Sequence, residues 1–562
     1  MEIVYDYGYL SHTTHAISKT IAWKEGMNMS PFFKKRTKKN KVPTIPESKI
    51  LENSTKIISP KLEDNIYEIN KIFQKNMDFL IRKFNLFGKT PAVLICLKSL
   101  VSTEKIDRDI IKLLQEGEPL SDPSQQVTQY IINNILYFSD VKEVSELSSF
   151  IKAISSGKAL ILIEGEEYGI ELDVVEKEKR SIEEPATERV VRGPRDGFIE
   201  QIMTNISLLR YRLPVPEFQI EETEVGKRTR TKVAICYMDD IVSEDLLKEV
   251  KMRIDAINID SILDAGYIEQ FIQDRPNSPF PQVQNTERPD KVIGNILEGR
   301  VAILIDGSPF ALIVPATFNQ FYQTSEDYYE RWIISSFVRI VRMAALIFSL
   351  TFSSFYITVL SFHPELIPAN FVVAAASGRQ GVPFPVIFEV LVMEFAMEIL
   401  REATVRMPQQ VGGALSIVGV LVVGQAAVQA GFVSPITVVI IALSTIGSFA
   451  TPSYNAATAF RMLRFLLIIL AGTFGLLGLA VGIMLVLNHM LSLRSFGIPY
   501  MTPFSPGNIK SLKDSIFRAP FYWLKERPAE NHVRDAQRIG KKVKDTTKNN
   551  FLDNNGGDFD ET

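Results

Sequence analysis

Two stretches of the chain, GKALILIEG at residues 157–165 and GRVAILIDG at residues 299–307, decide the first part of the fold. Each is a short apolar run between glycines that ends at Glu-Gly or Asp-Gly. A second apolar run follows each of them, at residues 168–175 and 310–314. Apolar runs on both sides of an acid-glycine pair are typical of a β-hairpin. The pattern therefore predicts two hairpins, 142 residues apart.

A second pair of segments repeats at nearly the same offset. Val-Leu-Ile-Cys at residues 93–96 resembles Val-Ala-Ile-Cys at residues 233–236. Val-Ser, acidic residues and an amphipathic segment follow each of them, which indicates a capped helix. Strand, helix and hairpin thus recur in one order, and the sequence predicts two related α/β lobes. We expect the first lobe at residues 61–190, a linker helix at 191–230 and the second lobe at 231–325.

The second half of the chain is apolar. Between Arg406 and Arg461 lie 54 residues without Asp, Glu, Lys or Arg, and such a stretch predicts burial in a membrane. We therefore expect a multi-domain protein, in which a two-lobed α/β soluble domain precedes an all-α polytopic membrane domain at residues 335–490. The predicted spans number four to five and comprise Met343–Leu360, Val411–Val433, Ser434–Ala459 and Phe465–Leu487, with the acidic segment Pro383–Met407 as the uncertain one.

Both ends of the chain are basic. Residues 1–60, with a lysine- and arginine-rich run at 34–41, are expected to form a disordered tail, and the alternative is a patch that contacts anionic lipid head groups. Residues 491–562 are expected to form a second basic, partly disordered tail with 12 Lys and Arg. The net charge of −3 gives no reason to expect nucleic acid. Two cysteines, Cys96 and Cys236, give no disulfide framework, which fits a reducing compartment.

The predicted topology contains a conflict. Three arginines (Arg331, Arg339 and Arg342) precede the first span and place the soluble domain in the cytosol. If the acidic segment Pro383–Met407 is a span, there are five spans and the basic C-terminal tail lies outside. If it is re-entrant, there are four spans and the tail lies in the cytosol. Four other arginines (Arg401, Arg406, Arg461 and Arg464) then lie outside. A hairpin near Phe496–Pro506 would reconcile five spans with a cytosolic tail, which is the side we expect.

The acidic segment Pro383–Met407 carries Glu389, Glu394, Glu398 and Glu402. At 100° per residue, the last three fall within an arc of about 80°. Because an ionised side chain in hydrocarbon costs about 2.5–3.5 kcal/mol even on a lenient scale, this stripe must face water, a partner or a basic group. One reading is a cation path, in which a symmetric oligomer turns the stripe into acidic rings.

The other reading of the stripe is structural: the helix lies on the membrane surface, or its glutamates pair with arginines. Two further polar residues, Gln425 and Gln429, share one face of the next apolar segment. Their side chains could form hydrogen bonds across a subunit boundary, or they could line a pore. Both alternatives remain open from the sequence. The arginines considered as partners of the stripe are Arg401, Arg406, Arg461 and Arg464.

The linker between the lobes begins Arg192-Gly193-Pro194-Arg195. Free backbone N–H groups near a helix start can bind an anion, although Pro194 lacks one. The alternative is a structural turn whose arginines pair with acids, and the acids considered were Glu217, Glu221 and Glu222.

The sequence contains no P-loop, HExxH or G-x-S-x-G motif, and its Cys and His residues lack metal-ligand spacing. We therefore expect neither an enzyme, nor a cofactor, nor a metal site.

Several long strings resemble one family. They include Arg192-Gly-Pro-Arg-Asp-Gly-Phe198, a string that ends in Asp306-Gly307-Ser-Pro-Phe310, and Phe362-His-Pro364-Glu-Leu-Ile-Pro368. Others are Glu398-Ile-Leu-Arg-Glu-Ala403 and Val418-Gly-Val-Leu-Val-Val-Gly-Gln-Ala-Ala-Val428. Over residues 60–530 the chain resembles the A subunit of spore germinant receptors, the GerA-type family.

The resemblance implies a multi-pass subunit of the inner spore membrane, with its N-terminal domain in the cytosol or spore core. It implies a permease-like B subunit and a lipoprotein C subunit as partners, contact with membrane lipid, and a homo-oligomer, taken as a pentamer. The implied activity is a nutrient-gated channel that releases monovalent cations, with residues of the shared strings as structural or gating positions. A non-conducting scaffold that couples the permease to other machinery is the alternative, and a transporter or lipid-handling enzyme working alone is the third class.

Overall fold

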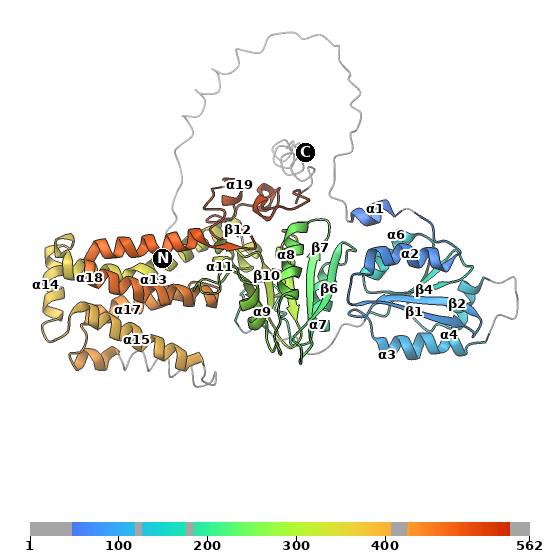
Figure 1. Ribbon diagram of the computed structural model, residues 1–562, viewed down its shortest axis with the longest axis horizontal. Coiled ribbons are helices and arrows are strands. Elements are labelled where there is room, and N and C mark those ends of the chain that lie inside the picture. Colours follow the sequence, from blue (N-terminus) through green and yellow to red (C-terminus); the bar gives the residue numbers. More distant parts are fainter. Residues whose placement is uncertain are drawn as a thin grey trace, which may run out of the picture. The chain divides into compact units, whose positions relative to one another are not determined.

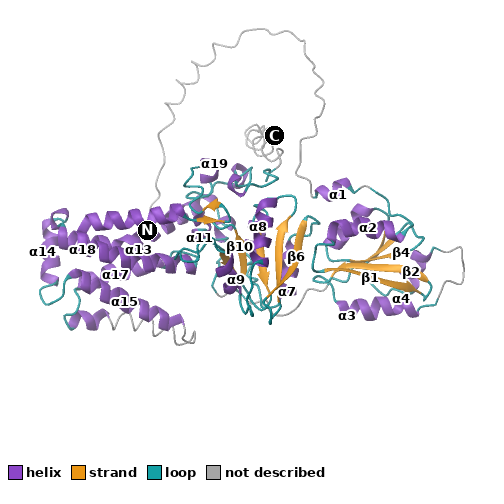
Figure 2. Cartoon of the chain, in the orientation of Figure 1, coloured by secondary structure: helices purple, strands orange, loops and turns teal. Residues whose placement is uncertain are grey.

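The computed structural model describes residues 48–54, 56–118, 126–175, 184–185, 187–405, 424–507 and 509–539. The first part of this chain holds two five-stranded sheets, and the second part is helical (Figures 1 and 2). The basic run at 34–41 and the segment 406–423 lie outside the described residues.

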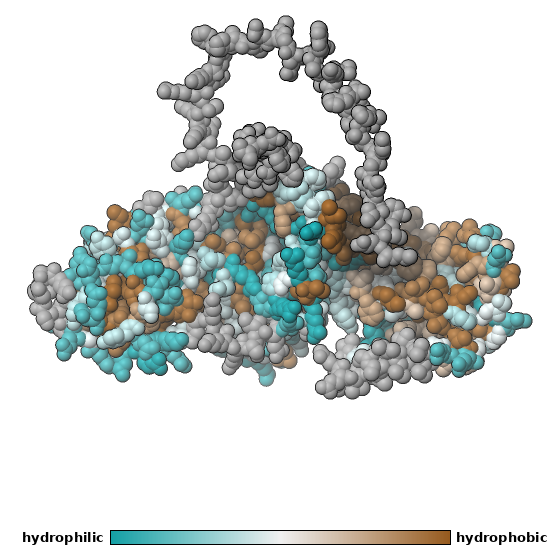
Figure 3. All heavy atoms as spheres, turned by 180° about the vertical axis from the view of Figure 1, so that it is seen from behind, coloured by the Kyte–Doolittle hydropathy of each residue, from teal (hydrophilic) through white to brown (hydrophobic). Residues whose placement is uncertain are grey.

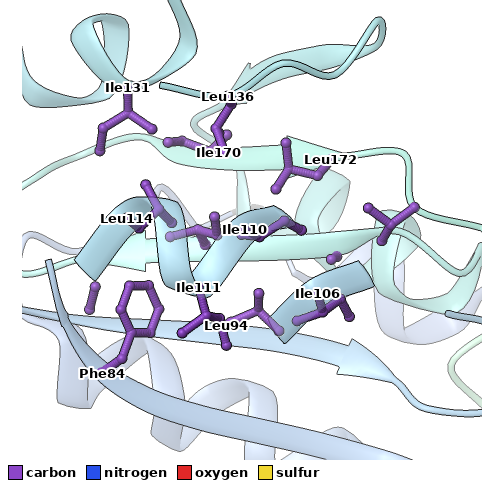
Figure 4. Close-up of a cluster of buried hydrophobic side chains, with 14 of the residues drawn as sticks. Phe84, Leu94, Ile106, Ile110, Ile111, Leu114, Ile131, Leu136, Ile170 and Leu172 are labelled. Carbon is purple, nitrogen blue, oxygen red and sulfur yellow. The ribbon is translucent and has the colours of Figure 1, made fainter. Parts of the chain in front are cut away.

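The first lobe is an antiparallel sheet between two layers of helices, with strand order β1-β2-β4-β5-β3. Isoleucines and leucines of η1, α4 and α5 pack on one face, and Figure 4 shows Ile110 and Ile111 over Leu94 of β2. Helices α2 and α6 pack on the other face. The elements are α1 (Lys49–Asn53), α2 (Leu62–Phe73), β1 (Phe79–Leu86), β2 (Thr90–Leu97), α3 (Thr103–Lys105), η1 (Ile106–Ile111), α4 (Lys112–Glu116), α5 (Val127–Asn134), β3 (Val141–Val144), α6 (Leu147–Ser155), β4 (Ala159–Ile163) and β5 (Gly169–Leu172).

The second lobe repeats this plan, with strand order β6-β7-β9-β10-β8. The two predicted hairpins are confirmed as β4–β5 and β9–β10. Helices α8 and α9 cover one face of the second sheet, and α7 and α10 cover the other. The elements are α7 (Ile202–Arg212), β6 (Phe218–Val225), β7 (Thr231–Met238), α8 (Glu244–Asp255), α9 (Ala265–Ile272), β8 (Gln284–Thr286), α10 (Pro289–Ile296), β9 (Val301–Ile305) and β10 (Ala311–Val314).

The order of elements moves one predicted boundary. Helix α7 and strand β6 hold the places in the second lobe that α2 and β1 hold in the first. From the sequence, α7 and β6 are expected in a linker at 191–230. Strand β6 is not recognised there as part of the repeat, because it alternates apolar and charged residues. The linker is therefore shorter than predicted, and the repeat is correspondingly longer.

A buried ion pair joins the two lobes. The guanidinium of Arg210 on α7 lies 2.9 Å from the carboxylate of Asp78, and both side chains are almost completely buried. Arg210 also donates to Asn76, whose own side chain binds the backbone of Ile220 on β6. These bonds satisfy the buried charges, so the pair fixes the contact between the lobes.

The helical part follows the second lobe. Two of its helices, α13 and α18, are long and apolar enough to cross a membrane. Only 28% and 39% of their most apolar stretches are buried, whereas the core helix of a soluble protein is mostly buried. The elements are α11 (Phe318–Tyr322), α12 (Glu326–Tyr329), α13 (Trp332–Phe362), η2 (Pro364–Leu366), α14 (Ala369–Gly378), α15 (Val386–Val405), the helical residues 424–429, α17 (Pro435–Ser448) and α18 (Tyr454–Ser492).

Helix α18 is a hairpin that reverses at Gly475, where φ is +60° and ψ is −137°. A Cβ on Gly478 would lie 1.9 Å from the carbonyl oxygen of Leu470, and one on Gly482 would lie 2.5 Å from the Leu467 side chain. Eight residues of a straight helix span about 12 Å, so these approaches require two antiparallel arms. The close contact of the arms depends on glycine, because small residues let helices approach closely.

Two predicted spans are thereby corrected. Phe465–Leu487 is not one span, because the chain turns back inside it at Gly475. Ser434–Ala459 is not continuous either, since α17 ends at Ser448 and α18 begins at Tyr454. Pro452 stands in the gap, where it favours a break in the helix.

Burial in the helical part differs from burial in the sheets. The buried residues of α13 and α17 are largely serines and threonines, whereas phenylalanines and leucines are exposed. Figure 3 shows hydrophobic residues gathered over this part of the surface. Exposed examples are Ile333, Phe337, Phe474, Leu477 and Met484.

The C-terminal segment, residues 493–539, returns to the second lobe. The hydroxyl of Ser495 accepts from the backbone of Ala316 at 2.9 Å and donates to the carbonyl of Gln282 at 2.7 Å. The side chain of Asn531 donates to the carbonyl of Glu298 at 2.8 Å. This segment includes β11 (Arg494–Ser495), β12 (Ile498–Pro499), α19 (Ile509–Leu512), η3 (Phe521–Trp523) and η4 (Ala529–Asn531).

An elbow at residues 323–331 connects the second lobe to α13. Arg339 on α13 is fully buried and lies 2.9 Å from Asp327 and 2.8 Å from Asp514. Burial opposes ionisation of Asp327, but hydrogen bonds from Arg342 and the charge of Arg339 outweigh it and lower the pKa. The elbow, the first turns of α13 and the C-terminal segment are thus held together by charge.

Candidate functional site: a layered polar core

The acidic face of α15 points into the helical part. Its opposite, apolar face is exposed at Phe388, Val392, Phe395 and Ile399. A helix that exposes its apolar face and buries its acids reverses the pattern of a soluble surface helix. Glu389, Glu394 and Glu398 each pair with an arginine, and hydroxyl groups contact either the carboxylate or its arginine. These three layers together are called the polar core.

The Glu389 layer lies at the start of α15. Arg379 lies 3.1 Å from one oxygen of the Glu389 carboxylate. The other oxygen accepts from the backbone N–H of Ser434 and the hydroxyl of Thr437, both at 2.9 Å. Tyr356 on α13 is 3.1 Å from the Thr437 hydroxyl. Glu389 is therefore anchored to the amino-terminal end of α17, where a carboxylate is also favoured by the helix dipole.

The Glu394 layer comes next along α15. Arg464 on the first arm of α18 lies 2.8 Å from the carboxylate, and the hydroxyl of Ser353 donates to it at 2.8 Å. Ser353 is also 3.2 Å from the hydroxyl of Ser444 on α17. Glu394 and Arg464 are 5% and 3% exposed, so this pair is buried against four different helices.

The Glu398 layer is more open. Arg401 lies 2.9 Å from the Glu398 carboxylate and Arg461 lies 3.4 Å from it. Arg401 also donates to the hydroxyl of Ser448, the last residue of α17. Glu398 is 42% exposed, so solvent screens this layer more than the other two.

The layers are stacked along α15. At 1.5 Å per residue, Glu389 and Glu394 are about 7.5 Å apart along the axis, and Glu394 and Glu398 about 6 Å. The buried hydroxyls of Ser354 on α13 and Thr445 on α17 have no hydrogen-bond partner among the described residues. A column of carboxylates, guanidiniums and hydroxyls in an apolar helical part can hold water or exchange ions, and equally can lock helices in register.

The remaining members of the predicted acid stripe and glutamine pair lie apart from this column. Glu402 is exposed near the end of α15. Gln425 and Gln429 are exposed as well. Arg406, one of the arginines considered as a partner, lies outside the described residues.

The linker arginines do not pair with the acids considered from sequence. Arg192 lies 3.6 Å from Glu330, and Arg195 lies 3.2 Å from Glu184. All four side chains are substantially exposed, so both pairs are weak. The backbone carbonyl of Pro194 accepts from the buried Arg288, which gives this turn a structural role.

Gly193 in the same turn has φ +135°, and a Cβ there would lie 2.8 Å from the ring of Tyr329. The close approach to an elbow residue requires glycine at this position.

The other predicted gating positions also shape the backbone. The carboxylate of Asp306 accepts from the backbone N–H of Ile202 at the start of α7, and Gly307 has φ +85° in the hairpin turn. Pro364 begins η2 and Pro368 precedes α14, on the short connection after α13.

Sequence reasoning missed the hydroxyl side of the polar core. Ser353, Thr437 and Ser444 lie in long apolar segments, where single hydroxyls are common and give no periodic signal. Arg379 was missed because it lies between helices, ten residues before its partner Glu389. A search for polar residues on one face of α13 and α17 would have found Ser349, Ser353 and Thr437.

Comparison with known proteins gives the family. Residues 67–530 match the model of the Bacillus/Clostridium GerA spore germination protein. Spore germination protein KA of Bacillus subtilis (strain 168) is 42% identical over 86% of this chain and 89% of its own length.

Two other relatives cover similar spans. Spore germination protein GerLA of Bacillus cereus is 37% identical over 85% of this chain and 97% of its own length. The uncharacterized membrane protein YfkQ of Bacillus subtilis (strain 168) is 37% identical over 87% of this chain and 95% of its own length. The crystal structure of the N-terminal domain of the A subunit of the Bacillus megaterium spore germinant receptor GerK3 is 28% identical and covers 47% of this chain and 98% of that one, with a TM-score of 0.37.

The fold and the polar core define a protein with an α/β sheet-containing N-terminal region and an α-rich C-terminal part that carries two candidate membrane helices. The chain belongs to the GerA spore germination family, the A subunits of germinant receptors.

Proposed function

We propose that this chain is the A subunit of a nutrient-sensing germinant receptor, and that copies of it assemble into a germinant-gated cation channel that releases ions at germination. In this proposal it spans the inner membrane of the spore several times, keeps its two lobes in the cytosol or spore core, and works with a permease-like B subunit and a lipoprotein C subunit. The homo-oligomer is taken as a pentamer.

The observation that carries the proposal is the polar core. Removing a carboxylate and a guanidinium from water costs several kcal/mol each, and replacing such a pair by apolar residues is often stabilising. A helical part that served only as an anchor gains nothing from Glu389 and Glu394 at its centre. Ionisable residues at membrane depth instead mark ion paths and moving parts. A rearrangement that separates Glu394 from Arg464 would expose a carboxylate to a water-filled path.

A second candidate, a non-conducting subunit that transmits a signal from the permease-like partner, is favoured by a different observation. The carboxylates of the three layers are already paired with arginines of the same chain, as in a packing contact. In that case the polar core fixes the register of the helices and carries no ions.

Reconstitution in planar bilayers separates the two candidates. A channel predicts a conductance that germinant opens when the partner subunits are present. Glu398→Gln, in the open layer, should leave assembly intact and lower the permeability of cations relative to anions, because Arg401 and Arg461 keep their charge. Glu365→Gln, at an exposed acid after α13, is the matched control. Normal assembly without any conductance would instead establish the signal-transmitting role.

A further inference from the structure

Residues 517–523 of the C-terminal segment expose a cluster of aromatic side chains. Phe517, Phe521, Tyr522 and Trp523 are each between 47% and 58% exposed. The last three are consecutive and form η3. Large apolar side chains that gather on a surface mark a contact with another protein or with a membrane. These four residues are called the aromatic patch, and the contacts around them indicate what covers it.

The aromatic patch is held against the first two turns of α13. The hydroxyl of Ser336 accepts from the backbone N–H of Arg518 at 3.1 Å. The guanidinium of Arg518 lies 4.3 Å from the centre of the Phe521 ring. Three residues before the patch, Asp514 lies 2.8 Å from the buried Arg339. The patch therefore lies beside the start of α13.

The outer face of α13 is apolar at the same turns. Side chains there that are apolar and between 41% and 66% exposed are Ile333, Ile334, Phe337, Val338 and Val341. The arginines of these turns face inward, since Arg339 and Arg342 both pair with Asp327 and are largely buried. The apolar outer surface of this candidate membrane helix therefore continues to its first residues, next to the aromatic patch.

Helix α13 is longer than the hydrocarbon core of a membrane. Its 31 residues span about 46 Å, whereas the hydrocarbon core is about 30 Å thick. The uncharged stretch Met343–Leu360 fills about 27 Å of that core, and α13 ends shortly afterwards at Phe362. The excess length thus lies before Met343, and the turns that hold the aromatic patch emerge among the lipid head groups.

We propose that the aromatic patch lies in the head-group region of the membrane and anchors the C-terminal segment to lipid. Tyrosine and tryptophan favour this region, because each ring is apolar and carries one polar O–H or N–H group. Residues 513–527 contain four basic and two acidic side chains, and their net positive charge suits anionic head groups.

Lipid is the occupant rather than a protein, because the patch is continuous with the exposed face of a helix long enough to cross a membrane. The proposal rests on α13 crossing the membrane, as in the proposed function, and it does not require the chain to conduct ions.

Fluorescence quenching of the full chain in lipid nanodiscs tests the depth of the patch. The discs contain phosphatidylcholine and phosphatidylglycerol, with a nitroxide quencher either on the head group or on the acyl chain. Cys96 and Cys236 are buried, so a cysteine-reactive NBD fluorophore reports on one added cysteine. Tyr522→Cys probes the patch. Ile347→Cys, at an exposed residue within α13, and Tyr137→Cys, at an exposed residue of the first lobe, are the matched controls.

We expect the head-group nitroxide to quench the label at position 522 at least twofold, and more than the acyl-chain nitroxide does. The acyl-chain nitroxide should quench more strongly at position 347, and neither quencher should affect position 137. Quenching at 347 without quenching at 522 would overturn the anchor but leave the membrane-spanning role of α13 intact. Quenching at neither position would overturn both.

Iodide, a quencher dissolved in water, identifies the alternative occupant. Because lipid shields the patch, iodide should quench the label at position 522 at least twofold less than the label at position 137. Equal quenching at the two positions would contradict the anchor. A label at 522 that is shielded from iodide and also unaffected by either nitroxide would show that a protein, such as a second copy of this chain, covers the patch, and the lipid proposal would then be wrong.

Discussion

The sheets bury almost only apolar side chains, whereas the helical part buries hydroxyls and ion pairs beside its apolar clusters. The second sheet is filled on both faces by isoleucine, valine and leucine, with Val233, Ile303 and Leu304 almost completely buried. The helical part buries Ser353, Thr437 and the Glu394–Arg464 pair, and it exposes many of its large apolar residues.

This difference in buried side chains indicates a difference in the surroundings of the sheets and of the helical part. Apolar residues leave water for a protein interior because their transfer is favourable, and this drives the sheets to bury them. A part that keeps many apolar residues on its surface does not gain this transfer free energy for them, a pattern that suits apolar surroundings. Hydroxyls and ion pairs then hold the helices together.

The largest test of this comparison removes one charge from the polar core. Glu394→Leu leaves Arg464 buried without its partner and should cost about 3–5 kcal/mol. Arg464→Leu in the same chain should recover most of the loss, because the double variant has no unpaired charge. The melting temperature of the full chain in detergent reports both changes. Glu365→Leu, at an exposed acid, should melt as the wild type does. A wild-type melting temperature for Glu394→Leu would show that the pair is not buried.

The next test concerns the reversal of α18. Gly475→Ala places a Cβ at φ +60° and 2.9 Å from the ring of Phe362, which should cost about 2–4 kcal/mol through backbone strain and overpacking. Gly381→Ala, at a glycine with open space around it, is the matched control. Equal proteolytic resistance of the two variants would contradict the hairpin.

A pair of isosteric changes sharpens the comparison. Val233→Thr buries a hydroxyl in the second sheet, and Thr437→Val removes a donor from Glu389. Each should cost about 1–3 kcal/mol, although the two changes are chemical opposites. Thermal unfolding of both variants measures this. If Thr437→Val were neutral, the polar core would not depend on its hydroxyls.

The smallest effect depends on pH. Burial, with a further contribution from Asp264, raises the pKa of Glu269 on α9 from 4.5 to about 7. The folded chain therefore holds a proton that the unfolded chain releases, and stability is lost as pH rises from 4.5 to 7. Glu269→Gln avoids this loss and should be more stable by about 1–2 kcal/mol at pH 8, with no difference at pH 4. Melting temperatures at the two pH values give the result, and an equal difference at both would refute the raised pKa.

The sequence predicted the repeat because its central strands are buried on both faces. Residues 93–96 and 233–236 have no polar positions to obscure the similarity. The outer strands β1 and β6 were not predicted, because edge strands with exposed charged residues, such as Arg82 and Glu222, carry little apolar signal.

Only the charged residues of the polar core were predicted from the sequence, and its hydroxyl groups were not. Four glutamates in an apolar segment are conspicuous, and pairing with Arg401, Arg461 and Arg464 was one of the readings left open. The hydroxyls that complete each layer come from α13 and α17, and their position depends on how three helices pack. The reversal at Gly475 could not be predicted, because glycines at the same spacing also occur in straight helices that pack closely.

Because the C-terminal segment packs back on the second lobe, that lobe cannot complete its fold until the ribosome has made the segment. The bond between Ala316 and Ser495 joins residues 179 apart, and the bond between Glu298 and Asn531 joins residues 233 apart. At about 5–20 residues per second, the ribosome needs roughly 9–36 seconds to deliver Ser495 after Ala316. During that interval the second lobe lacks part of its covering, while the apolar helices are emerging. The lobe can reach its final form only after the helical part has been made.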